Sequence, residues 1–337
     1  MKRLQFSPKF ALLLISIMLT GAAEEPAAPT PTLPEESAEF PQSSDIDWLK
    51  GRFEGASSSE QRRFYQIMER SNECQKEAAA RLRSELAQRG FPEAQISDFG
   101  VGPVECRTVI APVVPEGASW DAFMNAWHRV SPMIETYILA VEIAERTSAP
   151  DAGSPLRSQL VARTVGEQML RYASNWGNGE MSDAPPVSGM ERSILTSRIW
   201  AETAKRDHEN TRWLKRVVEM NGWPRISDVG EKAADAAWLL AQHADADPLF
   251  QLDALQAMEP LVTSNEVRPQ NFALLKDRVT LKLAGYQRYG TQYECRDNQF
   301  VPRMLEDADK VEAWRAEVGL DSLVENQQRI RKSFGSC

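Results

Sequence analysis

Apolar residues recur every three or four positions along most of this 337-residue chain, which is the pattern of amphipathic helices. The clearest example runs from Ser58 to Arg89, and the Gly90 and Pro92 that follow are typical of a helix end. Residues 101–115 differ, because their valines and isoleucines lie among prolines and glycines. We expect a short extended segment there.

Helical spacing returns at residues 123–143. Pro132 predicts a break or a kink in that helix, because proline lacks the N–H that a helix interior uses. Another helix is expected over residues 156–172. Residues 177–190 are rich in glycine, proline, asparagine and aspartate, so they predict a loop, and we place a boundary between two lobes in it.

The second half of the chain predicts a series of helices, each bounded by residues that favour helix ends. They cover residues 190–205, 207–220, 228–240, a segment from 248, 269–283, 307 or 309 to 318, and a segment from 321. The expected caps and ends are Asp207, Gly222, the capping box of Asp228 and Glu231, Asp247 before Pro248, Gly285, Asp307 or Asp309, Gly319 and Asp321.

The predicted fold is therefore all-α, with two helical lobes and at most a short extended segment near 104–115. We divide the chain into a signal peptide (1–23), a disordered linker (24–47), an N-terminal helical lobe (48–185) and a C-terminal helical domain (186–337). The linker assignment follows from five prolines and seven acidic residues with no lysine or arginine, a composition that cannot bury enough apolar surface to fold.

The first residues resemble a secretory signal. Lys2, Arg3 and Lys9 precede a short apolar run, and small residues end the segment at Ala23. We therefore expect a soluble protein that is exported to the periplasm or secreted, with no further membrane span once the signal is removed.

Charge argues against nucleic acid as a partner. Residues 1–23 hold three of the 39 basic residues and no acidic one, which leaves 36 basic and 48 acidic residues, a net charge of −12. Binding to phosphate backbones needs a basic stripe, and the sequence has none. It also lacks a glycine-rich phosphate loop and the GxSxG, HExxH and SxxK motifs, so no cofactor is predicted.

The four cysteines all follow the signal, where an oxidising compartment lets them pair. Three connectivities are possible. We favour Cys74 with Cys106 and Cys295 with Cys337, because each pair lies within one predicted lobe. Buried free thiols are the alternative.

Short polar and aromatic blocks follow one another in the last third of the chain: Asn221–Pro224, Ala237–Leu239, Gln242–Asp245, Asp277–Val279, Tyr289–Gln292 and Val318–Leu320. In this order they resemble an uncharacterised bacterial domain of unknown function over residues 207–330. The resemblance implies no activity, but it favours a shared polar site in this region.

We take His243 and Asp245 as candidate catalytic residues. The imidazole of His243 could act as a general base, oriented by Asp245 or Asp277, while Gln292 or the turn at Gly290 holds a developing negative charge. The candidate ligand-binding residues are Gln242, Asp277, Arg278, Tyr289, Thr291 and Gln292. His128 and His208 are expected to be structural.

Two alternatives remain for His243. It could simply interact with the dipole at the end of its helix, or it could bind a metal with Asp245 and Asp247, although side chains two positions apart diverge on a helix. We predict a pocket in the C-terminal lobe for a small polar molecule, glycan or peptide end, with binding or hydrolysis as its function. The alternative is an envelope scaffold or protein-interaction module without catalysis.

Overall fold

The computed structural model describes residues 40–41, 45–148, 155–178, 184–187 and 189–334. The predicted signal peptide lies outside the described residues, as does most of the predicted linker. Phe40–Cys337 forms one compact unit. The predicted boundary between two lobes near residue 185 stays a prediction.

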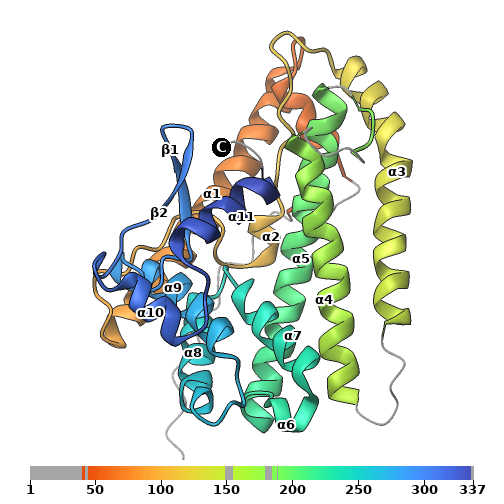
Figure 1. The fold of residues 1–337 in the computed structure, drawn as a ribbon. Helices are drawn as coiled ribbons and strands as arrows, with labels where there is room; N and C mark the ends of the chain where they lie inside the picture. Colours follow the sequence, from red (N-terminus) through yellow and green to blue (C-terminus); the bar gives the residue numbers. More distant parts are fainter. Residues whose placement is uncertain (1–39, 42–44, 149–154, 179–183, 188, 335–337) are drawn as a thin grey trace, which may run out of the picture. The chain divides into compact units, whose positions relative to one another are not determined.

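The described chain is mostly helical, which confirms the predicted fold class (Figure 1). Its elements, in order, are η1 (Asp47–Arg52), α1 (Ser58–Gln88), α2 (Val104–Arg107), α3 (Trp120–Thr147), α4 (Pro155–Ser174), η2 (Asn175–Asn178), α5 (Gly189–Asn221), α6 (Ile226–Val229), α7 (Glu231–Gln242), α8 (Pro248–Val262), α9 (Pro269–Ala284), β1 (Tyr293–Arg296), β2 (Gln299–Pro302), α10 (Val311–Glu317) and α11 (Leu323–Phe334).

Several helix ends have the predicted residues. Asp247 caps α8 by accepting the backbone N–H of Phe250 at 3.0 Å, with Pro248 as the first helical residue. Gly222 follows α5 with a φ of 74°, and Gly285 ends α9 in the left-handed conformation with a φ of 78°. Glycine reaches this conformation without the steric cost that a Cβ atom brings.

Helix α3 continues through Pro132, so it does not break there, and the kink that we gave as the other possibility stays a prediction. Two predictions about α5 are wrong. Helix α5 joins the two helices expected at 190–205 and 207–220. Asp207 is therefore not a cap: it lies within α5, and its carboxylate accepts hydrogen bonds from Arg171 of α4. A local capping signal was overridden by a tertiary ion pair.

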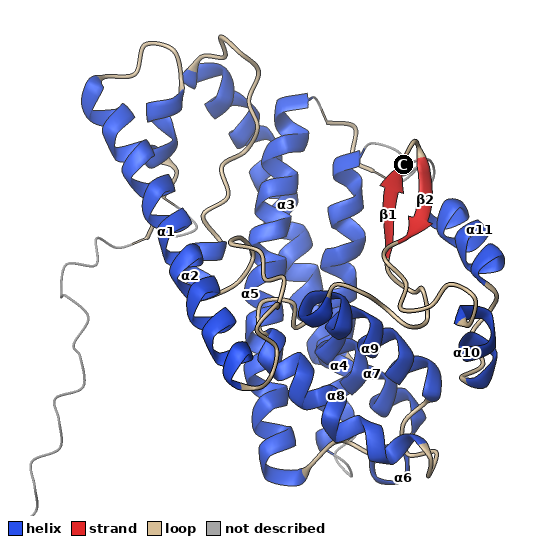
Figure 2. Cartoon of the chain, turned by 90° about the vertical axis from the view of Figure 1, so that its left-hand side faces the viewer, coloured by secondary structure: helices blue, strands red, loops and turns tan. Residues whose placement is uncertain are grey.

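We expected a short extended segment at 104–115. The structure instead begins this region with the short helix α2. A two-stranded antiparallel hairpin, β1 with β2, was not predicted (Figure 2). Its turn consists of Asp297 and Asn298, which both have positive φ and suit a two-residue hairpin loop.

Other predicted caps differ as well. The expected capping box of Asp228 and Glu231 is absent, because a short helix ends at Val229 and α7 starts after Gly230 without a side-chain cap. Helix α10 starts after Lys310 without a side-chain cap. At the start of helix α11, Ser322 and Glu325 each accept the backbone N–H of the other, so Ser322 takes the capping role predicted for Asp321.

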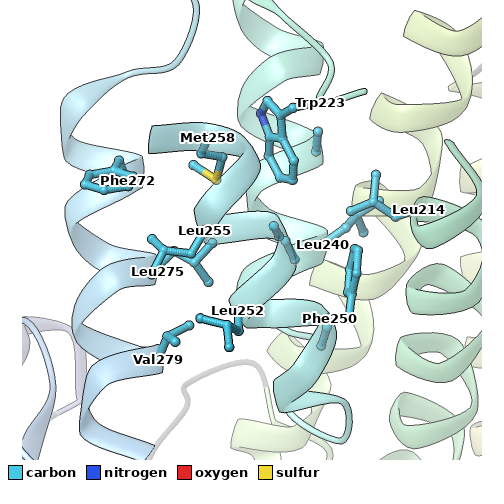
Figure 3. Packing of buried hydrophobic residues seen from close by; sticks show 14 of the residues in the cluster. Leu214, Trp223, Leu240, Phe250, Leu252, Leu255, Met258, Phe272, Leu275 and Val279 are labelled. Atoms are coloured by element: carbon cyan, nitrogen blue, oxygen red, sulfur yellow. The ribbon is translucent and has the colours of Figure 1, made fainter. Parts of the chain in front are cut away.

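Two hydrophobic clusters form the core, and the helices α1, α4 and α5 contribute to both. One cluster contains Leu214, Leu240 and Leu275 from α5, α7 and α9 (Figure 3). The other contains Phe123, Leu170 and Ile194 from α3, α4 and α5. Because α4 packs against α3, α5 and α7, it brings residues of both clusters into one framework.

The predicted disulfide between Cys74 and Cys106 is confirmed, with 6.1 Å between the two Cα atoms, and it ties α2 to α1. Cys295 lies on β1, whereas Cys337 lies outside the described residues, so the second pairing stays a prediction. Within the described residues, no helix combines the length and the apolar character needed to cross a bilayer.

Candidate functional site

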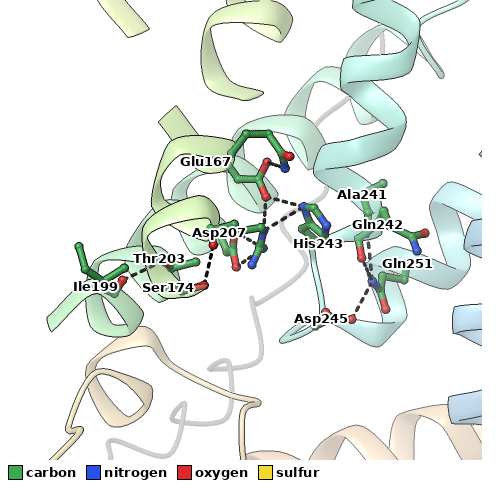
Figure 4. A network of polar contacts seen from close by, with 12 residues as sticks. Glu167, Ser174, Ile199, Thr203, Asp207, Ala241, Gln242, His243, Asp245 and Gln251 are labelled. Carbon is green, nitrogen blue, oxygen red and sulfur yellow. Dashed lines mark hydrogen bonds and ion pairs between the residues drawn. The ribbon is translucent and has the colours of Figure 1, made fainter. Parts of the chain in front are cut away.

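His243 lies at the C-terminal end of α7, where it meets a buried acid from α4 (Figure 4). Its Nδ1 is in contact with Oε1 of Glu167. The Glu167 side chain is only 1% exposed, whereas that of His243 is 18% exposed. The imidazole therefore has a buried carboxylate on one side and access to solvent on the other.

Arg171 connects this pair to α5. Its Nε donates to Glu167, one helical turn earlier on α4, and its Nη2 donates to both carboxylate oxygens of Asp207 at 2.8 and 2.9 Å. One guanidinium thus serves two carboxylates. Since Arg171 can balance only one of their negative charges, a further proton on Asp207 or His243 would make the cluster neutral.

The contacts of Nδ1 select one tautomer of His243. Nε of Arg171 lies 3.1 Å from Nδ1 and always carries a hydrogen, but it already donates to Glu167. A buried carboxylate needs hydrogen-bond donors, and Gln168 supplies only one more, at 2.8 Å. We therefore assign the hydrogen to Nδ1, donated to Glu167. Nε2 is left as an acceptor, and it has no hydrogen-bond partner among the residues that the structure describes.

Burial and neighbouring charges shift the acids of this cluster in opposite directions. Burial, with the nearby Glu167 carboxylate, raises the pKa of Asp207 to about 6 in spite of Arg171. Burial also acts to raise the pKa of Glu167, but His243 and Arg171 outweigh it and hold that pKa below its ordinary value. Glu167 is therefore the ionised partner of the imidazole.

The cluster borders a cavity of about 1010 Å³, which we call the His243 cavity. Its wall includes His243, Arg171 and Asp207, with α1, α2 and the middle of α5 completing it. Apolar side chains form part of the same wall: Met68, Phe99, Val109, Ile110 and Trp200. This combination of apolar surface with a few polar groups is usual for small-molecule sites.

Asp245 does not orient His243. Its carboxylate accepts from Lys282 at 2.6 Å, from Arg278 at 2.7 Å and from Gln251 at 3.4 Å. Burial acts to raise its pKa, but the two cations outweigh burial and lower the pKa of Asp245. The role predicted for Asp245 or Asp277 beside the imidazole is filled instead by Glu167.

Asp277 has a different environment. It is fully buried, and its carboxylate accepts the backbone N–H groups of Arg288, Tyr289 and Thr291, each at 2.9 Å. The Tyr289 carbonyl also accepts from the buried Arg315 at 2.5 Å. These bonds hold the loop after α9 to the helix, so the block Tyr289–Gln292 has a structural task in this chain.

The structure does not bring His243 and Gln292 to the same cavity. Gln292 and Arg278 line a second cavity of about 1010 Å³ beside β1 and β2, and of the predicted site residues only Asp245 borders both. Gln242 is buried, and its Oε1 has no hydrogen-bond partner in the described part of the chain. It lines neither cavity.

The metal alternative has no support from the geometry. Asp247 pairs with Lys215 at 2.8 Å and caps α8, and Asp245 is held by two cations. The described residues contain no group of three histidine, cysteine, aspartate or glutamate side chains placed to hold a metal ion.

Sequence reasoning missed Glu167 and Arg171 and treated Asp207 only as a helix cap. Glu167 and Arg171 lie four residues apart on one helix face, a common spacing for an ion pair that gives no indication of a site. In the sequence, Glu167 stands at a position of α4 where its spacing from the apolar residues predicts burial, and a buried glutamate usually needs a partner. That position was the signal for the site that the sequence contained.

Comparison with known proteins identifies one segment of the chain. Residues 183–336 match the model of a family described as a family of unknown function (DUF6624). This finding confirms the resemblance to a domain of unknown function. Neither a search of the curated proteins nor a search of the solved structures gave a match.

Proposed function

We propose that the protein binds a small polar molecule in the His243 cavity and that Nε2 of His243 acts there as a general base in a hydrolytic step. The observation that carries this proposal is the contact between Nδ1 and the buried carboxylate of Glu167. A carboxylate on Nδ1 fixes the tautomer and the orientation of the ring, and it stabilises the imidazolium that forms when Nε2 takes a proton.

Three further features support the proposal. The imidazole is partly exposed and borders a cavity large enough for a small molecule. Its nitrogen Nε2 has no competing partner among the described residues. Arg171 holds Glu167 in place and is itself held by Asp207, so the supporting residues are fixed by the packing of α4 against α5 and α7.

The tautomer can be tested directly by long-range ¹H–¹⁵N correlation NMR of the histidine rings at pH 8. We expect a protonated Nδ1 and an unprotonated Nε2 for His243 in the wild type. In Glu167→Gln the preference for this tautomer weakens, because a neutral amide is a poorer acceptor than a carboxylate. A ring protonated on Nε2 in the wild type would contradict the proposed mechanism.

Activity is tested with p-nitrophenyl acetate and p-nitrophenyl phosphate as probes, using wild type, His243→Asn and the exposed histidine variant His128→Asn as control. A general base typically contributes a factor of about 10² to 10⁴ in rate. We expect His243→Asn to lose at least 10²-fold in the hydrolysis of a probe that the wild type turns over, with His128→Asn unchanged. Equal rates in wild type and His243→Asn would refute the catalytic role and favour a scaffold.

We also propose that the protein is exported, as the basic, apolar and small residues before Glu24 indicate. The disulfide between Cys74 and Cys106 supports an oxidising compartment. Amino-terminal sequencing of protein recovered from the cell envelope or medium should start at Glu24. A mature protein that still starts at Met1 in the cytoplasm would contradict export.

A further inference from the structure

The acids that line the His243 cavity are mostly neutralised by the protein itself. Asp207 pairs with Arg171, Asp245 with Lys282, and Asp247 with Lys215. The remaining acid of the wall, Glu219, is exposed to solvent near the C-terminal end of α5. Three of the four acids in this wall are therefore paired with a cation, although Asp207 shares Arg171 with Glu167.

Several cations of the same wall have no such partner. Arg107, Arg212 and Arg216 form no ion pair with any acid in the described part of the chain. The Nε of Arg107 donates to the carbonyl of Gly102 at 3.0 Å, but its two terminal nitrogens have no protein acceptor among the described residues. Among the described residues, the unpaired charge of the wall is thus mainly positive, with three arginines against Glu219. Of these four side chains only Arg107 is partly buried, and the other three are exposed.

Arg107 is the most notable of these cations because it is partly withdrawn from water. Burial lowers its pKa, although Asp207 and Glu105 act in the opposite direction. A desolvated guanidinium without a carboxylate costs free energy, and binding of an anion would recover it. Natural sites for carboxylates and phosphates use arginine in this way, since its planar group can donate two parallel hydrogen bonds.

The structure holds Arg107 in a fixed position. Helix α2 is tied to α1 by the disulfide of the neighbouring Cys106, whose carbonyl also accepts from Ser71 at 2.7 Å. Gly102, which accepts from Arg107, packs so closely on Ala78 that an added Cβ would lie 2.5 Å from the Ala78 Cβ. Such preorganisation lowers the entropy cost of binding a ligand.

Arg212 lies one turn after His208 on α5, and both residues line the cavity. Burial, Arg107 and Arg212 together lower the pKa of His208 and outweigh Glu105 and Glu209, which act in the opposite direction. Two guanidinium groups from different helices, α2 and α5, therefore act on the same imidazole. Trp200 and Phe99, both substantially exposed, offer apolar surface in the wall of the same cavity.

We propose that Arg107 and Arg212 bind the anionic group, a carboxylate or a phosphate, of a small ligand whose apolar part lies against Trp200 and Phe99. This inference rests on the proposed function, in which the cavity is a ligand site. It adds the chemical class of the ligand and a binding residue, Arg107, outside the segment that matches the family model.

The test measures binding of benzoate, phenyl phosphate and neutral benzamide by NMR titration of the full-length protein, with circular dichroism as a check of folding. We expect one of the two anions to bind at least tenfold more tightly than benzamide, and the comparison of benzoate with phenyl phosphate identifies the anionic group. Arg107→Gln should lose this preference and bind the anion at least tenfold more weakly. Arg62→Gln, an exposed arginine of α1 outside the cavity wall, should bind like the wild type.

Three outcomes would overturn the inference. The wild type could bind the anions and benzamide equally, or it could bind neither anion at millimolar concentration. The third is an unchanged affinity for the anion in folded Arg107→Gln. His243→Asn separates the two proposals, because it should keep the anion preference while losing hydrolysis; anion binding that survives with no catalysis would refute only the general base.

Discussion

Asp207 should make the protein less stable as the pH rises through about 6. Its carboxyl group is held between α4 and α5 with its side chain 19% exposed, and it shares Arg171 with Glu167. Burial, with the nearby Glu167, raises its pKa from an ordinary value of 3.8 to about 6. The folded protein therefore retains a proton on Asp207 at pH values where the unfolded chain has lost it.

The sign and size follow from linkage between proton binding and folding. Between pH 3.8 and 6 the folded state binds more protons at this site than the unfolded state, so lowering the pH stabilises the fold. The loss of unfolding free energy caused by the ionised Asp207 is complete above about pH 6 and absent well below pH 3.8. At 1.36 kcal/mol for each pH unit, this difference corresponds to about 3 kcal/mol.

Urea unfolding of wild type and Asp207→Asn between pH 3 and 8 measures this contribution. Titrating groups outside the cluster of Glu167, Arg171, Asp207 and His243 are common to both proteins, so the difference in unfolding free energy, wild type minus variant, reports the titration of this cluster. We expect this difference to fall by about 3 kcal/mol between pH 3 and 7. The same comparison with Asp309→Asn, an exposed aspartate before α10, should stay flat. A flat or rising difference for Asp207→Asn would refute the reasoning.

Three other substitutions test the framework of the fold by urea or thermal unfolding. Replacing Cys74 and Cys106 by serine removes a link across 32 positions and should lower the free energy of unfolding by up to about 4 kcal/mol. A reductant should produce the same loss in the wild type, and no loss would contradict the stabilising role of the disulfide. Asp277→Ala leaves three backbone N–H donors without their acceptor and should lower the free energy of unfolding by about 3–5 kcal/mol. Amide exchange in the loop 288–291 should become faster. A loss under about 1 kcal/mol would argue against a structural role of Asp277. Gly51→Ala places a Cβ against the backbone of α1 and should cost about 1–3 kcal/mol, whereas Gly189→Ala, which meets no neighbouring atom, should be nearly neutral.

The sequence predicted best those features that depend on neighbouring residues. Asp247 with Pro248, and Gly285 after an amphipathic segment, mark helix ends through contacts within one turn, and the structure has both. The hairpin was missed although its signals were local: Asp297 and Asn298 suit a two-residue turn, but the strands on either side are only four residues long.

The candidate site was predictable only in part, because its decisive contacts are distant in sequence. His243 and Arg171 are 72 positions apart and meet only because α4 packs against α7. Asp245, two positions from His243, was the nearest carboxylate along the chain, but Lys282 and Arg278 of α9 hold it instead. Spacing along the sequence could therefore identify the imidazole and not its partner.

The origin of the site residues bears on what the matched family segment can do. His243 and Asp207 lie within residues 183–336, whereas Glu167 and Arg171 on α4 and Arg107 on α2 precede it. Without α4 the imidazole would lose the carboxylate that selects its tautomer, and Asp207 would lose its ion pair with Arg171. If His243 is a general base, its competence in this chain therefore depends on helices outside the matched segment, and the packing of α4 against α5 and α7 is the structural condition for the proposed chemistry.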